Sequence, residues 1–208
     1  MTTQSKPPVV GILLASHSHR TTNSGEKCLK KLMGKPVLSY VIERASPQVS
    51  SLILNANGDP TRFQDISIPV VPDAIEELSG PLAGILTGME WARDNDPKAE
   101  WLATFATDSP FIPHDLVLHM LEEIERHQAD MAYISCGGKP HPEYGLWPVE
   151  LAEDLRYALT EENIKRVDKW TQLYNAITVE YPAKPIDRFT LSNNIEGIVD
   201  VERNYAAQ

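Results

Sequence analysis

The chain has 208 residues, of which 42% are hydrophobic and 23% are charged, enough apolar side chains to bury the core of one ordinary domain. Lys and Arg number 19 and Asp and Glu number 29; the resulting net charge of −10 excludes a protein that coats nucleic acid or anionic lipid, because such binding needs clustered cations. No apolar run approaches the roughly 18 residues of a membrane span, and the polar start does not resemble a signal peptide, so we expect a cytoplasmic protein with no membrane partner.

Strand-like and helix-like segments alternate through the first 128 residues. Short apolar runs predict strands at 9–15, 51–54, 68–72 and 101–106. Helical spacing or helix-start signals predict helices from Pro36 through Ile42, from Gly80-Pro81 to about Arg93, and at 115–127. This alternation predicts an α/β fold in which helices cover both faces of a parallel sheet.

The remaining residues are less regular. Strands are expected at 131–135, 145–148 and 176–181, and helices at 151–159 and 196–207. No internal repeat, low-complexity tract or long linker divides the chain. We therefore expect one domain over residues 1–208.

Polar residues follow four of the predicted strands: Ala15-Ser16, Asn55, Asp73 and Asp108. Ligands of parallel sheets bind beyond the carboxyl ends of the strands, so these residues predict a binding site. Beside a phosphate-bearing ligand, Asp108 would be a natural Mg²⁺ ligand. Asp108 and Asp73 could equally form turns or caps, which Asp favours.

The loop 16–27 is where a phosphate-binding loop would lie, yet Gly25 is its only glycine and no glycine fingerprint occurs. Lys27 either neutralises a phosphate or is an exposed surface lysine. His17 and His19 are two residues apart, but no third ligand has a matching spacing, so solvated histidines are favoured over a zinc site.

Other residues that could take part in binding or catalysis have a simpler structural interpretation. Gly84 allows the helix that starts at Gly80 to pack closely on the sheet, and the positive end of that helix could also face an anion. His141 contacts a substrate or is a satisfied structural group. Cys28 and Cys136 are too few for a secreted disulfide framework, and we expect free thiols.

Taken in order, these segments resemble the molybdenum cofactor guanylyltransferases, a family within the larger nucleotidyltransferase group. The matching stretches cover nearly the whole chain and read GILLA, LMGKPVLSYVIERA, LILNANGD, VVPD, SGPLAGILTGMEWA, ATDSPFIPHDL, HPEYGLWPVELAEDL and RVDKW. ATDSPFIP together with SGPLAGI is the most specific combination.

The resemblance implies a three-layer, Rossmann-like nucleotide-diphospho-sugar transferase fold with a mostly parallel mixed sheet. It implies transfer of GMP from GTP to molybdopterin with release of pyrophosphate, Mg²⁺ as cofactor, and molybdoenzyme maturation proteins as further partners. The nucleotide-binding half would be 1–128 and the acceptor-binding half 129–208. Carried over by motif, the nucleotide-binding residues are Leu14, Ala15, Ser16, Arg20, Lys27, Asn55, Asp73 and Asp108.

Among these residues the resemblance assigns separate roles. Lys27 would approach the phosphates, Asn55 and Asp73 would hold the guanosine part, and Asp108 would bind Mg²⁺; Lys27 and Asp108 would be the catalytic pair. Metal and lysine would offset charge in an in-line displacement while the protein positions the reactants.

The sequence departs from the family pattern at the nucleotide loop. Ser16 and His17 stand where the family has two glycines, Glu26 replaces an aspartate, and Leu191 replaces a late asparagine. Glycines let backbone N–H groups approach phosphates closely. Two alternative functions are therefore a catalytically impaired relative that binds molybdopterin or a partner, and a nucleotidyltransferase for another phosphorylated acceptor.

Overall fold

The computed structural model describes residues 8–15, 28–78, 80–184 and 187–189. Its strands are β1 (Val9–Leu14), β2 (Lys31–Leu32), β3 (Lys35–Pro36), β4 (Ser51–Asn55), β5 (Val70–Val71), β6 (Trp101–Ala106), β7 (Met131–Cys136), β8 (Lys139–Pro148) and β9 (Ala176–Tyr181). Its α-helices are α2 (Val37–Ala45), α3 (Pro81–Asn95), α4 (Leu116–His127), α5 (Ala152–Thr160) and α6 (Val167–Thr171). None of the helices in these ranges is long and apolar enough to cross a membrane.

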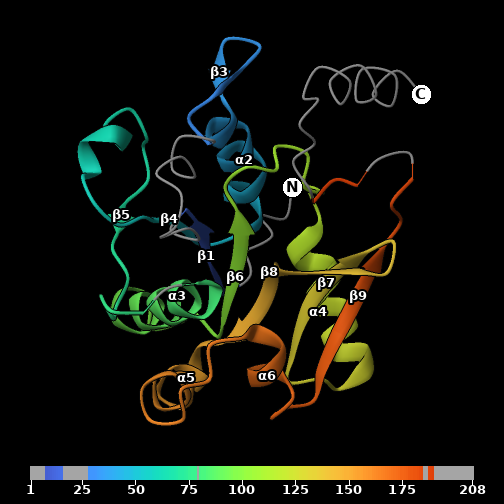
Figure 1. The fold of residues 1–208 in the computed structure, drawn as a ribbon. Helices are drawn as coiled ribbons and strands as arrows, with labels where there is room; N and C mark the ends of the chain where they lie inside the picture. The colour runs from blue at the N-terminus through green and yellow to red at the C-terminus, as the bar shows by residue number, and fades with distance from the viewer. Residues whose placement is uncertain (1–7, 16–27, 79, 185–186, 190–208) are drawn as a thin grey trace.

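Seven of the described strands form one sheet in the order β5-β4-β1-β6-β8-β7-β9 (Figure 1). Strand β1 pairs in parallel with β4 and β6, β4 with β5, and β7 with β9. Strand β8 is antiparallel to its neighbours β6 and β7. The mostly parallel mixed sheet is therefore confirmed.

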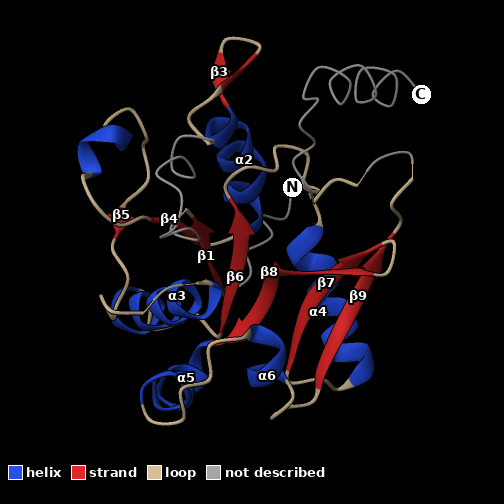
Figure 2. Cartoon of the chain, in the orientation of Figure 1, coloured by secondary structure: helices blue, strands red, loops and turns tan. Residues whose placement is uncertain are grey.

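Helices cover both faces of the sheet and make three layers (Figure 2). Successive side chains of a strand point to opposite faces, and β1 shows the consequence. Val9 and Leu13 join the core that includes α2 and α4, whereas Ile12 and Leu14 join the core formed with α3, α5 and α6. A strand buried on both faces requires the continuous apolar run that the sequence has here.

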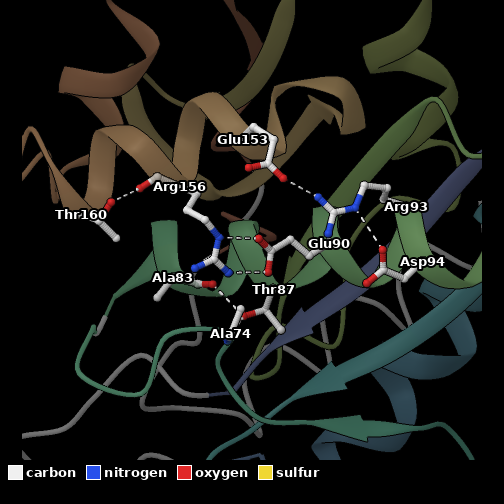
Figure 3. Close-up of polar contacts among 9 residues, drawn as sticks. All are labelled: Ala74, Ala83, Thr87, Glu90, Arg93, Asp94, Glu153, Arg156 and Thr160. Atoms are coloured by element: carbon white, nitrogen blue, oxygen red, sulfur yellow. Dashed lines mark hydrogen bonds and ion pairs between the residues drawn. The ribbon is translucent and has the colours of Figure 1, made fainter.

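The first half of the chain is tied to the second by an ion pair between α3 and α5. The Arg156 guanidinium donates two hydrogen bonds of 2.8 Å, one to each carboxylate oxygen of Glu90 (Figure 3). The Glu90 side chain is only 14% exposed, so this bidentate pair is largely shielded from water. It fixes α5 against the helix that approaches the strand ends.

The structure changes the bounds of several predicted elements. The strand expected at 68–72 is only β5, and the one expected at 145–148 is the last part of the ten-residue β8. Residues 139–144, which include Pro140 and Pro142, were not predicted as strand, yet proline is tolerated where a strand leaves the regular ladder. The β2–β3 hairpin and helix α6 were not predicted. The helix expected at 196–207 lies outside the described residues.

Candidate active site

The carboxyl ends of four parallel strands lie side by side at one edge of the sheet. Leu14 of β1 is paired with Asn55 of β4 on one side and with Ala106 of β6 on the other, and Asn55 is paired with Val71 of β5. Asp73 follows β5 by two residues and Asp108 follows β6 by two. The structure thus brings the predicted strand-end residues to one edge, where ligands of such sheets bind.

Asn55 and Asp73 are hydrogen-bonded to each other. The Asn55 amide donates to Asp73 Oδ1 over 2.8 Å, and the Asn57 amide donates to Asp73 Oδ2 over 2.7 Å. Asn57 Oδ1 in turn accepts from the backbone N–H of Asp73 over 2.8 Å. Asn55 is fully buried and Asp73 is half-buried, so the network presents a fixed carboxylate at the surface of the edge.

Helix α3 supports this network through Thr87, whose contacts with Ala74 and Ala83 are drawn in Figure 3. The Thr87 hydroxyl accepts a hydrogen bond of 2.8 Å from the backbone N–H of Ala74, the residue after Asp73, and donates to the Ala83 carbonyl. A Cβ on Gly84 would come within 2.6 Å of Leu14 and 2.8 Å of Asn55 Oδ1. The predicted role of Gly84 in close packing is therefore confirmed, and it places the first turns of α3 directly against the strand ends.

Asp108 lies half-buried in the turn after β6. It does not cap the following helix, because the residue before α4 is Asp115. Its carboxylate lies close enough to Cys28 and Tyr144 to contribute to raising the pKa of both groups. Within the described ranges no cluster of three or more His, Cys, Asp or Glu side chains could hold a metal ion. A single carboxylate nevertheless fits Mg²⁺, which is bound through one or two carboxylates plus substrate phosphates.

Cys28 is buried beside the same turn. The pKa of its thiol is raised to about 11, and burial is the main cause. The charge of Asp108 also raises this pKa, whereas a hydrogen bond with Thr107 lowers it. Cys28 and Cys136 are both free and buried, as expected from the sequence.

The second half of the chain also reaches this edge. The Ser109 hydroxyl donates to the Phe189 carbonyl over 3.0 Å. The Phe189 ring lies 5.1 Å from the Tyr144 ring and 6.0 Å from the His141 ring, measured between centroids. Strand β8 and the segment 187–189 are thereby connected to the residue after Asp108.

Of the residues assigned by resemblance, the structure brings together Leu14, Ala15, Asn55, Asp73 and Asp108 at this edge. Ser16, Arg20 and Lys27 lie outside the described residues, as do His17, His19 and Leu191. Sequence reasoning missed Asn57 and Thr87, although Asn57 stands in the same strand-end segment as Asn55. Thr87 gave no sequence signal, since its hydroxyl meets Ala74 only in the folded chain.

The three-layer α/β sheet, with a carboxylate and amides at its strand ends and a helix packed against those ends, agrees with the nucleotidyltransferase class that the sequence motifs indicate. The sequence profile of the "MobA-like NTP transferase domain" matches residues 10–176. The chain therefore belongs to this domain family.

Relatives place the chain among the molybdenum cofactor guanylyltransferases, and a solved structure shares its fold. The chain is 41% identical to the molybdenum cofactor guanylyltransferase of Bradyrhizobium sp. over 98% of this chain and 96% of that protein. It is 40% identical to that of Nitrobacter hamburgensis over 95% and 94%. The crystal structure of molybdopterin-guanine dinucleotide biosynthesis protein A from Archaeoglobus fulgidus has a similar fold, with a TM-score of 0.64, 20% identity, and coverage of 96% of this chain and 100% of that one.

Proposed function

We propose that this protein transfers GMP from GTP to molybdopterin and releases pyrophosphate. The observation that carries the proposal is the edge at which Asn55, Asp73 and Asp108 lie together, in a chain that belongs to the guanylyltransferase family. An oxygen of the terminal phosphate of molybdopterin attacks the α-phosphorus of GTP. The bond between the α-phosphorus and the bridging oxygen breaks, and pyrophosphate leaves with that electron pair.

The nucleophile in this reaction needs no general base from the protein. A phosphate monoester has a second pKa of about 6, so its oxygen is largely ionised at neutral pH. The task of the chain is to hold two anions in line and to offset their charge. With a net charge of −10, the chain must do this by local groups and not by its overall field.

The guanosine part is assigned to the Asn55 and Asp73 side of the edge. Asp73 can accept from the N–H groups of guanine, because each oxygen of its carboxylate has a second lone pair beyond the bond to an asparagine amide. Asn57 accepts from the backbone N–H of Asp73, and Thr87 accepts from that of the next residue, Ala74; together they fix the direction of the carboxylate. Leu14, Ala15 and Ser16 would border the nucleotide from β1.

The phosphates are assigned to the Asp108 side. Asp108 would hold Mg²⁺, which when bound supplies positive charge to the phosphoryl oxygens. Lys27 and Arg20 would add positive charge from the loop 16–27. The position of Cys28 beside the Asp108 turn supports this role for Lys27. In this proposal residues 1–128 bind the nucleotide, residues 129–208 bind the acceptor, and molybdoenzyme maturation proteins receive the product.

The proposal is tested by calorimetric titration with Mg²⁺-GTP, using ATP and CTP as controls, followed by pyrophosphate release in the presence of molybdopterin. We expect binding selective for GTP, and pyrophosphate release that is lost in Asp108→Asn. Absence of GTP binding at millimolar concentration would overturn the proposed enzymatic function. GTP binding without pyrophosphate release would favour the impaired relative, and release with a different phosphorylated acceptor would favour the third function.

A further inference from the structure

Strand β8 contains a bulge at the acceptor side of the proposed site. Gly145 pairs with Tyr133 of β7, whereas the next pair along is His141 with Ile134, so residues 142–144 are inserted without partners in β7. A bulge redirects side chains and is frequent beside active sites. Here the inserted residues include Glu143, on a strand adjacent to β6, whose end leads to Asp108.

His141 at the start of the bulge lies between two carboxylates. Its Nδ1 is 3.1 Å from Glu143 Oε1, and its Nε2 is 3.5 Å from Asp187 Oδ2. The His141 side chain is only 3% exposed, while those of Glu143 and Asp187 are 29% and 28% exposed. The buried Nε2 has no hydrogen-bond partner in the described part of the chain, Asp187 included.

This arrangement fixes Glu143 but leaves it reachable. The buried imidazole holds one carboxylate oxygen, and the T-shaped contact of Tyr144 with Phe189 anchors the next residue of the bulge. Glu143 Oε2 makes no hydrogen bond within the described residues. A carboxylate accepts hydrogen bonds through both oxygens and repels phosphate, so Glu143 suits the part of an acceptor that carries N–H donors.

Molybdopterin has both kinds of group. Its phosphate must reach the Asp108 side, whereas its pterin ring carries the N3–H and 2-amino donors on one edge. These two parallel donors match the two oxygens of one carboxylate. We propose that Glu143 recognises this edge of the pterin and that His141 is the positioning residue that aims it; the inference rests on the proposed function and assigns its acceptor subsite.

The first test is Glu143→Gln, with Glu150→Gln as a matched control at the opposite end of β8. Glu150 is exposed in the segment after Pro148, so its substitution removes the same charge away from the bulge. We expect Glu143→Gln to raise the KM for molybdopterin about tenfold or more, with the KM for GTP unchanged, and Glu150→Gln to change neither. Wild-type protein that transfers no GMP would overturn the proposed function and this inference together; transfer with an unchanged molybdopterin KM in Glu143→Gln would overturn this inference alone.

The chemistry of the pterin edge is tested with two small inhibitors of the transfer reaction. Pterin carries the 2-amino group, and lumazine carries an oxygen in its place. We expect pterin to inhibit the wild-type protein at lower concentration than lumazine, and Glu143→Gln to lose this preference. Equal inhibition of the wild-type protein by the two compounds would contradict recognition of the donor edge.

The positioning role of His141 is tested with two amide substitutions. The Asn amide nitrogen overlaps the position of His Nδ1, and the Gln amide nitrogen overlaps that of Nε2. His141→Asn should therefore keep the contact with Glu143 and a near wild-type KM for molybdopterin, whereas His141→Gln should raise this KM. Thermal unfolding of both variants reports their folding, and a KM that follows stability instead of the retained nitrogen would contradict the positioning role.

Discussion

The Asn55 side chain donates a 2.8 Å hydrogen bond to Asp73 Oδ1 and so joins the ends of two neighbouring strands. Asn55 is fully buried, which makes this amide a fixed part of the strand end and not a mobile surface group. Because helix α3 packs against the same amide at Gly84, strand, turn and helix meet at one point. Substitutions at Asp73, Gly84 and Thr87 each remove or displace one contact of this junction.

Asp73→Asn should weaken GTP binding and lower stability. An amide nitrogen would face the amide of Asn55 or Asn57, and losing one such hydrogen bond to a charged group costs about 1.5–3 kcal/mol. Calorimetry with Mg²⁺-GTP and urea unfolding measure the two effects. Asp65→Asn, at an exposed position in the connection between β4 and β5, is the control and should change neither; equal effects at both positions would contradict the role of Asp73.

Two glycines one turn apart on α3 should respond differently to alanine. A Cβ at Gly84 meets Leu14 and Asn55 at the site, whereas a Cβ at Gly88 meets Leu102 and Ile12 within the core. Both changes overpack the helix and should cost about 1–3 kcal/mol of stability. Only Gly84→Ala should raise the KM for GTP, because only it displaces Asn55; the same KM in both variants would refute this distinction.

Thr87→Val should disturb the Asp73 turn at a distance from any ligand. The substitution leaves the backbone N–H of Ala74 without its acceptor, at a cost of about 1–3 kcal/mol in stability, and frees the turn to move. Thr87→Ser keeps the hydroxyl and should lose only about 1 kcal/mol for the missing methyl group. The KM for GTP should rise in Thr87→Val and remain near wild type in Thr87→Ser. A rise of this KM in both variants would show that the lost methyl packing, and not the lost hydrogen bond, is responsible.

The buried thiol of Cys28 predicts a loss of stability at alkaline pH. Burial raises its pKa from 9.0 to about 11, so above pH 9 the unfolded chain releases the thiol proton while the folded chain keeps it. Stability from this group is complete below pH 9 and is lost as the pH rises to about 11, by up to about 2–3 kcal/mol. Urea unfolding between pH 8 and 10.5 should show a shallower decline in Cys28→Ala, and parallel declines would exclude this contribution.

The apolar runs and their spacing determined the three-layer class and the edge at which the site lies. The apolar run Val9–Leu14 favours a strand buried on both faces, and because parallel strands end at one edge, Asn55, Asp73 and Asp108 converge there. The hydrophobic period and the alternation of strands and helices along the chain are local properties, which is why they could be predicted from sequence.

The contacts that aim these side chains were decided only by the tertiary structure. Thr87 reaches Ala74, Ser109 reaches Phe189, and His141 reaches Asp187 across sequence separations that no pattern encodes. The bulge in β8 depends on how β7 and β8 register, and only residues 145–148 of that strand were predicted. Hydrogen bonds between distant segments form only when the sheet and helices pack, so sequence located the site whereas the fold set the direction of its side chains.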